Sequence, residues 1–267
     1  MNIDRYKTIL TFIILFSIFS LWTFDSGQCQ EKHTKEWIIS TFQGKTPQAW
    51  GERVKGVKTR LNTDQKVLAM TFDACDDPKN LGYDTKLIRY LESEKVPATL
   101  FISGKWIDAN PELFKKLADN PLFEIENHGL NHKPCSAIGR SAYGIEGTKS
   151  VGDIFDEIEL NALKIQTLTS QKPKYYRPGT VYCDEICVEI ANALGYEVVS
   201  FSVLGDAGAT YSKEQVKKAL LHSAPALIIL MHLNHPGGET AEGVIEAIPE
   251  LKKRGFRFPK LSEYGLR

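Results

Sequence analysis

The chain has 267 residues, and its 33 Lys and Arg are balanced by 33 Asp and Glu, so its formal net charge is zero. With 42% hydrophobic and 25% charged residues, the composition is that of a globular protein with a sizeable core, which excludes a disordered chain. A neutral balance offers no general field for phosphate backbones, so nucleic acid is not expected as a partner.

The amino terminus has the pattern of an export segment. Residues 8–24 are uncharged, follow Arg5 and Lys7, and precede the polar stretch 25–29. The apolar run is long for the core of a cleaved signal and slightly short for a spanning helix, so cleavage and retention both stay open. We therefore expect residues 1–30 to be a signal peptide or membrane anchor. The protein is then periplasmic, secreted or at the cell surface, with membrane association through residues 8–24 where they are retained.

Four cysteines follow this segment: Cys75, Cys135, Cys183 and Cys187. In an oxidising compartment they can form two disulfides in three connectivities, and free buried thiols are the alternative. No two of them have the C-x-x-C spacing of a zinc knuckle, so a metal site built on cysteine is not expected.

Residues 31–63 are mixed and polar with little periodicity, which indicates a linker or lead-in. Short apolar runs then predict seven strands, at residues 66–73, 98–103, 122–127, 174–177, 197–202, 226–232 and 256–258. Amphipathic stretches between them predict helices at residues 84–94, 111–119, 153–168, 184–194, 213–222 and 242–253. This alternation indicates parallel strands joined by crossover helices, so we expect residues 64–267 to form one α/β sheet or barrel.

Side chains capable of chemistry follow the predicted strands at their carboxyl ends: Asp73, His128, His132, Arg177, Asp206 and His232. Because the carboxyl ends of parallel strands lie at one edge of a sheet, we expect these side chains to converge there. His128 and His132 have the i, i+4 spacing of a helical turn, which is typical of two ligands to a divalent metal and equally compatible with a solvated face. Asp73 or Asp206 alone could simply form a turn or cap a helix. Such local roles do not explain why all six of these side chains follow predicted strands.

These residues fall into an ordered set of motifs: Thr71-Phe72-Asp73, His128-x-x-x-His132, Tyr176-Arg177-Pro178, Asp206 and Leu230-Met231-His232. Over about residues 64–264 the chain resembles the polysaccharide deacetylases, the NodB-homology group of carbohydrate esterase family 4. The resemblance implies a distorted (β/α) barrel, usually of seven strands. It also implies metal-dependent hydrolysis of N-acetyl groups on the amino sugars of peptidoglycan, a poly-N-acetylglucosamine polymer or a lipid-linked sugar.

The resemblance further implies a role for each motif residue. His128 and His132 are the metal ligands, with zinc as the expected ion and cobalt or nickel as alternatives. Asp73 is the general base that activates water, and Arg177 orients it. His232 is the general acid that protonates the leaving amine.

The remaining implied roles support this chemistry. Asp206 orients the acid histidine and raises its pKa, as acid–base chemistry near neutral pH requires. Leu230 belongs to the apolar pocket for the acetyl methyl group. A backbone amide between Gly179 and Tyr182 contacts the developing oxyanion, and Tyr182 is a candidate substrate-binding residue.

The chain departs from the family pattern at three places. The family usually has two adjacent aspartates in the first motif, the second of which binds the metal, whereas here Asp73 is followed by Ala74. The third ligand stays open between Asp73 itself, Asp76, Asp77 and water. Gly129 replaces the hydroxyl residue that commonly follows the first histidine, and the fourth motif lacks its usual tryptophan.

Within this family frame, Cys75 and Cys135 each lie just beyond a motif residue. This predicts a Cys75–Cys135 disulfide bracing the site, with Cys183–Cys187 as the remaining pair. Two other functions stay open: a metal-dependent hydrolase of another non-peptide C–N amide bond, which Ala74 makes conceivable, and an inactive carbohydrate-binding barrel.

Overall fold

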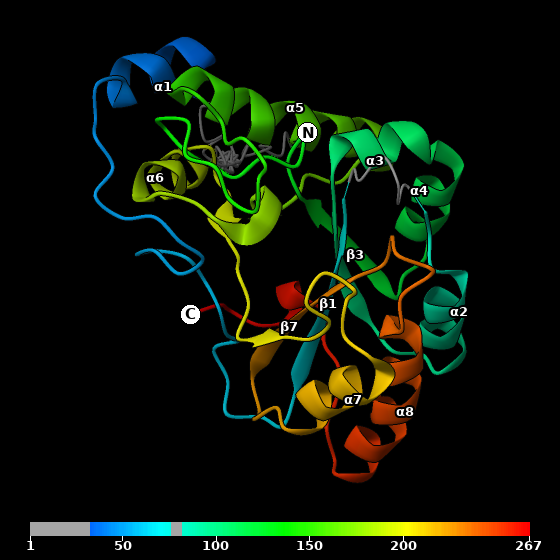
Figure 1. Ribbon diagram of the computed structural model, residues 1–267. Coiled ribbons are helices and arrows are strands. Elements are labelled where there is room, and N and C mark those ends of the chain that lie inside the picture. The colour runs from blue at the N-terminus through cyan, green and yellow to red at the C-terminus, as the bar shows by residue number, and fades with distance from the viewer. Residues whose placement is uncertain (1–32, 76–81) are drawn as a thin grey trace, which may run out of the picture. The chain divides into compact units, whose positions relative to one another are not determined.

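The computed structural model describes residues 33–75 and 82–267, and a sheet of seven parallel strands runs through its centre (Figure 1). The strands are β1 (Leu68–Ala74), β2 (Ala98–Ile102), β3 (Phe123–Asn127), β4 (Tyr175–Tyr176), β5 (Glu197–Val198), β6 (Val203–Leu204) and β7 (Leu227–His232). Their order across the sheet is β5-β4-β3-β2-β1-β7-β6, and the sheet curls into a half-barrel. The expected distorted (β/α) barrel is confirmed.

The seventh strand differs from the one expected. Of the predicted strand 197–202, only residues 197–198 form a strand, β5, which pairs with β4 at one edge of the sheet. Strand β6 begins just after the predicted run and pairs with β7 at the other edge. The short connection between β5 and β6 therefore joins both edges and curls the sheet. The predicted strand 256–258 is wrong, because residue Arg257 makes only one bridge, to Val67, while its neighbours Phe256 and Phe258 point into the core.

Eight α-helices occur in the described residues: α1 (Lys35–Phe42), α2 (Thr85–Ser93), α3 (Gly104–Ala109), α4 (Pro111–Ala118), α5 (Val151–Thr169), α6 (Glu185–Ala193), α7 (Lys213–Leu221) and α8 (Thr240–Lys253). Each of the six predicted helices is present. The side chain of an N-cap residue starts most of them, as Asp84 does for α2 and Ser212 for α7. Helices α7 and α8 pack together on one part of the sheet, whereas α1, α5 and α6 gather on another (Figure 1).

Helices α1 and α3 lie where no element was predicted. Within the stretch expected to be a linker, Thr34 caps α1, and its residues Ile38 and Phe42 are buried in the cluster that α5 and α6 share. Helix α3 has only six residues, and Ser103 caps it directly after β2. Such short helices are stabilised by packing, so the amphipathic signal in their sequence is weak.

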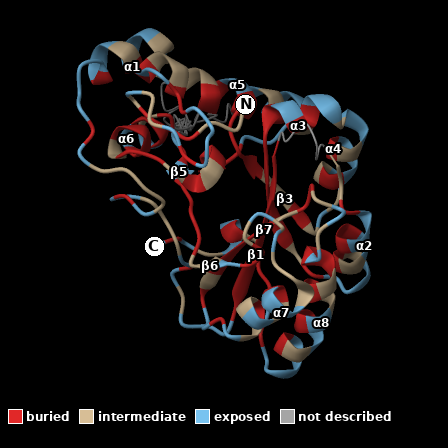
Figure 2. Cartoon of the chain, in the orientation of Figure 1, coloured by how far each residue is buried: buried red, intermediate tan, exposed pale blue. Residues whose placement is uncertain are grey.

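The core is divided by the sheet. Strand β1 is buried along its whole length, as is most of β7 (Figure 2). Met70, Phe72 and Ala74 of β1 belong to the apolar layer that the outer helices cover. Alternate residues of the same strand, such as Ala69, face the inside of the barrel.

The predicted leader, residues 1–30, and the candidate ligands Asp76 and Asp77 lie outside the described residues. Among the helices that the structure does describe, none combines the length and apolar character needed to cross a membrane.

Candidate active site

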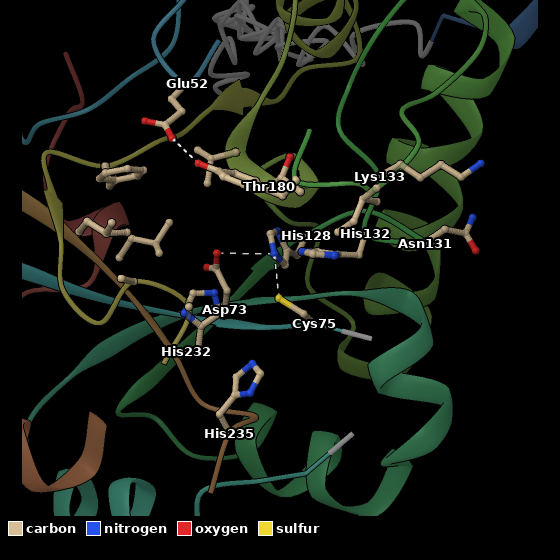
Figure 3. A pocket seen from close by; sticks show the side chains of 18 of the residues that line it. Glu52, Asp73, Cys75, His128, Asn131, His132, Lys133, Thr180, His232 and His235 are labelled. Carbon is tan, nitrogen blue, oxygen red and sulfur yellow. Dashed lines mark hydrogen bonds and ion pairs between the residues drawn. The ribbon is translucent and has the colours of Figure 1, made fainter. Parts of the chain in front are cut away.

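The predicted site residues converge at the carboxyl edge of the sheet, around a cavity of about 900 Å³ (Figure 3). Asp73 and His232 are paired positions on the neighbouring strands β1 and β7. Both line the cavity, as do Leu230 within β7 and the two histidines after β3, His128 and His132. Arg177 and Asp206 are fully buried just behind this wall, each against one of the lining side chains.

Asp73 is held by a buried ion pair. Its Oδ1 lies 2.6 Å from Nη1 of Arg177, and both side chains are almost inaccessible to solvent. The guanidinium also donates to the hydroxyl of Thr71 and to the carbonyl of Ser200, and it stacks on Phe101 at 4.0 Å. Burial lowers the pKa of Arg177, and the negative charge of Asp73 offsets part of that lowering. The cost of burying the guanidinium is reduced because it has hydrogen-bond acceptors around it. The pair therefore fixes the Asp73 carboxylate with Oδ2 directed at His128.

The two predicted metal histidines lie on a loop that is not a helical turn. His132 has φ +56° and Gly129 has φ +82°, so the i, i+4 interpretation as one turn of helix is wrong. The rings nevertheless meet, with their centroids 4.8 Å apart. Glu157 of α5 holds the loop by accepting hydrogen bonds from the backbone N–H groups of Asn131 and Lys133, at 2.9 and 3.0 Å.

Two glycines are required by this loop. A Cβ at Gly129 would overlap Oε1 of Glu157 and lie 3.2 Å from its Cδ, so the glycine makes room for the carboxylate that holds the loop. A Cβ at Gly179 would overlap the carbonyl oxygen of His132. The departure at Gly129 from the family pattern therefore has a local cause: only glycine fits both the left-handed backbone and the Glu157 contact.

His128 is oriented by a backbone carbonyl. Its Nδ1 lies 2.8 Å from the carbonyl oxygen of Arg177, which can only accept, so Nδ1 donates this hydrogen bond and Nε2 is the nitrogen left for another partner. Nε2 faces the cavity, 3.5 Å from Oδ2 of Asp73 and 3.6 Å from the sulfur of Cys75. A histidine that donates from one nitrogen to a backbone carbonyl and turns the other to a cavity has the usual arrangement of a metal ligand.

Cys75 is the site residue that the sequence analysis missed. Its sulfur and one ring nitrogen of each of His128 and His132 all lie within 4.8 Å of one another, a set suited in chemistry and spacing to a zinc ion. The expectation that no cysteine takes part in a metal site rested on the spacing of cysteine pairs alone and did not consider one cysteine beside two histidines. Burial raises the pKa of the Cys75 thiol, but the nearby imidazoles, His132 above all, outweigh this and leave the pKa well below its usual value.

The predicted Cys75–Cys135 and Cys183–Cys187 pairing is wrong. Cys135 is bonded to Cys187 in the first turns of α6, whereas Cys75 and Cys183 are free and buried. The reason lies in the loop after the histidines. The backbone of Cys135 in this loop forms hydrogen bonds with residues 182–184, directly before α6. The disulfide thus fastens the histidine loop to α6 and leaves the Cys75 sulfur in the cavity.

His232 is paired with a buried carboxylate. Its Nδ1 donates to Oδ1 of Asp206 at 2.9 Å, while Oδ2 of Asp206 accepts from the His232 backbone N–H and from the hydroxyl of Thr240. Burial lowers the pKa of His232, but the charge and hydrogen bond of Asp206 outweigh it, so the pKa stands well above its ordinary value. The geometry therefore keeps His232 protonated near neutral pH, with Nε2 directed away from Asp206.

The apolar part of the wall is made by Val181, Phe201 and Leu230, which form a small cluster of their own. Only Leu230 was predicted, because the other two lie in irregular segments. Tyr182 is not part of the cavity wall; its ring packs against Trp50 at 5.8 Å and against Tyr143 at 5.5 Å.

Thr180 and Val181 sit beside this wall in left-handed backbone, with φ +64° and +67°. Such strain in non-glycine residues is typical of functional sites. The side-chain oxygen of Thr180 is buried at the cavity with no hydrogen-bond partner among the described residues. Within the segment predicted to contact an oxyanion, Gly179 to Tyr182, the two central residues thus form a strained part of the cavity wall.

The comparison with protein families agrees with this geometry. A family model for polysaccharide deacetylases matches residues 60–199, more than half of the chain. The chain therefore belongs to the polysaccharide deacetylase family.

Two named members of the family are similar to this chain in sequence. The chain is 26% identical over 210 residues to the peptidoglycan-N-acetylmuramic acid deacetylase PdaA of Bacillus subtilis (strain 168), covering 76% of this chain and 72% of that protein. It is 27% identical over 213 residues to a peptidoglycan-N-acetylglucosamine deacetylase of Bacillus cereus, covering 78% and 92%.

Two solved structures share the fold. One is a family 4 carbohydrate esterase pseudoenzyme from Bacillus anthracis, with a TM-score of 0.65 at 22% identity, covering 77% of this chain and 67% of that one. The other is a family 4 acetyl xylan esterase from Clostridium thermocellum with a cobalt ion, with a TM-score of 0.60 at 23% identity, covering 74% and 89%.

Proposed function

We propose that this protein is a metal-dependent hydrolase that removes N-acetyl groups from the amino sugars of a cell-wall or surface polysaccharide. One observation carries the proposal: a carboxylate held by a buried arginine and an imidazole held by a buried carboxylate face the same cavity, beside two further histidines. The relatives named above act on peptidoglycan, one at N-acetylmuramic acid and the other at N-acetylglucosamine, which makes peptidoglycan the first substrate to test. Such a substrate lies outside the membrane, in agreement with the export predicted from residues 1–30.

His128 and His132 would hold the metal ion, which we expect to be zinc. When bound, zinc supplies a Lewis acid that polarises a carbonyl and acidifies water. Asp73 accepts a proton from the attacking water at Oδ2, because Arg177 occupies Oδ1. His232 gives a proton from Nε2 to the leaving amine, since its Nδ1 is bound to Asp206.

The substrate-binding part of the proposal uses the cavity walls. The apolar cluster of Val181, Phe201 and Leu230 suits an acetyl methyl group, and the strained rim at Thr180 lies next to it. Tyr143 is 75% exposed and lines the outer cavity, where an aromatic face can stack on a sugar ring.

The test is acetate release by the full chain from peptidoglycan and from N-acetylated chitooligosaccharides with zinc present. We expect Asp73→Asn and His232→Ala to lower kcat/KM by about 10²–10⁴-fold with the metal retained. His132→Ala should lose the metal, and the exposed His222→Ala is the matched control that should behave as wild type.

Two outcomes would replace this function. Sugar binding without metal and without acetate release would define an inactive carbohydrate-binding barrel. Turnover of another amide without acetate release would define a hydrolase of a different C–N bond.

A further inference from the structure

Cys75 follows β1 with its side chain in the cavity, next to both histidines of the metal pair (Figure 3). We propose that the Cys75 thiolate is the third protein ligand of the metal ion, replacing the carboxylate that the family motif usually carries after the Asp73 position. This inference rests on the proposed function for the presence of a metal, and it concerns only which atoms of this chain bind it.

The alternation of side chains along β1 brings the sulfur to the site. Successive residues of a strand point to opposite faces, so Asp73 and Cys75 share one face and Ala74 takes the other. Ala74 is fully buried in the apolar layer beneath the outer helices, together with Phe72. The residue beside Asp73 is therefore directed into the core, and the next side chain that reaches the cavity is Cys75.

The distance between the Cys75 sulfur and His128 is that of two ligands on one tetrahedral ion. With Zn–S of about 2.3 Å and Zn–N of about 2.0–2.1 Å, a sulfur and a nitrogen ligand are about 3.6 Å apart. Cys75 Sγ and His128 Nε2 are 3.6 Å apart, and the nitrogen of His132 completes a set within 4.8 Å. The cavity beyond this set leaves room for the open fourth position of a catalytic site.

The surroundings prepare all three atoms for this role. The Arg177 carbonyl accepts a hydrogen bond from Nδ1 of His128, which leaves Nε2 of that ring facing the sulfur. The backbone carbonyl of Cys75 accepts a hydrogen bond from the side chain of Asn234, which fixes the end of β1. Glu157 holds the backbone on both sides of His132.

Charge is conserved by the replacement. One thiolate and two neutral imidazoles leave a divalent ion with the same net charge as one carboxylate and two imidazoles. The difference is softness: a thiolate favours zinc and cobalt and disfavours magnesium, manganese and calcium. The proposed site should therefore bind fewer kinds of divalent metal than a site whose ligands are all nitrogen and oxygen atoms.

Other uses of the sulfur are limited by the fold. The disulfide joins Cys135 to Cys187, so Cys75 is free for the metal. The nearby Asp206–His232 pair offers one rival, in which the Cys75 thiolate attacks the acetyl carbonyl. The C–N bond would then break, the sugar amine would leave with a proton from His232, and the acetyl group would stay on Cys75 as a thioester. The experiment has to separate a ligand from such a nucleophile.

The experiment is Co(II) absorption spectroscopy on the full chain, stripped of metal and reloaded with one equivalent. We expect a thiolate-to-cobalt charge-transfer band in the near ultraviolet for wild type. Cys183→Ser, which removes the other free cysteine of residues 33–75 and 82–267, is the matched control and should keep the band. Cys75→Ser and Cys75→Asp should lose the band. The Kd for Zn(II) should rise by more than about 100-fold in Cys75→Ser, beyond the effect of an outer-shell change, and recover in Cys75→Asp.

The outcomes separate the ligand from the function. Bound Co(II) without the band in wild type would overturn the ligand, even where zinc-dependent acetate release upheld the deacetylase. The band without acetate release on any substrate would uphold the ligand and remove the proposed function. An acetyl thioester on Cys75, found by peptide mass mapping after incubation with substrate, would make Cys75 a nucleophile and overturn its role as ligand.

Discussion

The contact between Gly129 and Glu157 allows a quantitative test of how the loop that carries His128 and His132 is built. Replacing Gly129 by Ala has two costs. The first is the left-handed backbone, since φ is +82°, and a non-glycine residue there costs about 1–2 kcal/mol. The second is steric, because the new Cβ would overlap the Glu157 carboxylate.

The steric cost follows from what Glu157 has to give up. Its Oε1 accepts hydrogen bonds from the backbone of Asn131 and Lys133, and the side chain is 2% exposed. Bonds to a charged group contribute about 1.5–3 kcal/mol each, so displacing the carboxylate costs about 3–6 kcal/mol. The whole substitution should lower the free energy of unfolding by about 4–8 kcal/mol, a large part of the stability of an ordinary domain.

Gly139 provides the matched control. Its φ is +83°, and a Cβ there would meet no atom within 4 Å, so Gly139→Ala carries the backbone cost alone. Urea denaturation of both variants measures the difference directly, and the Kd for Zn(II) reports whether His132 has moved. In a Glu157→Ala background, Gly129→Ala should cost no more than the control. Equal costs for Gly129→Ala and Gly139→Ala in the wild-type background would refute the reasoning.

Three further predictions address other parts of the site. Asp206→Asn removes the charge that raises the pKa of His232. Because the acid must be protonated to act, the alkaline limb of the pH–kcat profile should move to lower pH. An unchanged alkaline limb would exclude His232 as the acid. Tyr143→Ala should raise KM several-fold for a polymeric substrate while kcat and the unfolding midpoint stay the same, and an equal fall in kcat would show that Tyr143 is not merely a binding surface. Cys187→Ser opens a disulfide with a sequence separation of 52 and should lower the free energy of unfolding by about 2–4 kcal/mol, measured by urea denaturation. Wild type in which this disulfide is reduced should have the same urea midpoint as the variant. A variant with a higher midpoint than reduced wild type would contradict the prediction.

The position of the site was accessible from the sequence for a simple reason. Parallel strands end at one edge, so Asp73, Arg177 and His232 had to meet once the strands were recognised. The strands themselves were recognisable because they are buried on both faces and read as continuous apolar runs. The predicted run 197–202 marks β5 but not its short length, and the way β5 and β6 link the two sheet edges depends on tertiary pairing.

Cys75 and the disulfide were missed for different reasons. The sequence did contain a signal for Cys75, since a residue two positions after Asp73 on a strand shares its face. The disulfide had no local signal, because it depends on the backbone pairing of residue Cys135 with the turn before α6. Likewise His132 reaches the site through left-handed backbone, which i, i+4 spacing does not reveal.

The arrangement of charges explains how an acid and a base can work as neighbours. Asp73 and His232 are paired positions on adjacent strands, so with no other partners they would form an ion pair with each other. Each instead has a buried counter-charge of its own: Arg177 contacts Asp73 at 2.6 Å, and Asp206 contacts His232 at 2.9 Å. The four charges sum to zero, and the two pairs leave Asp73 Oδ2 and His232 Nε2 directed at the cavity. Under the proposed function, the base and the acid are therefore held apart by their partners and kept in opposite charge states, as hydrolysis of an amide would require of them.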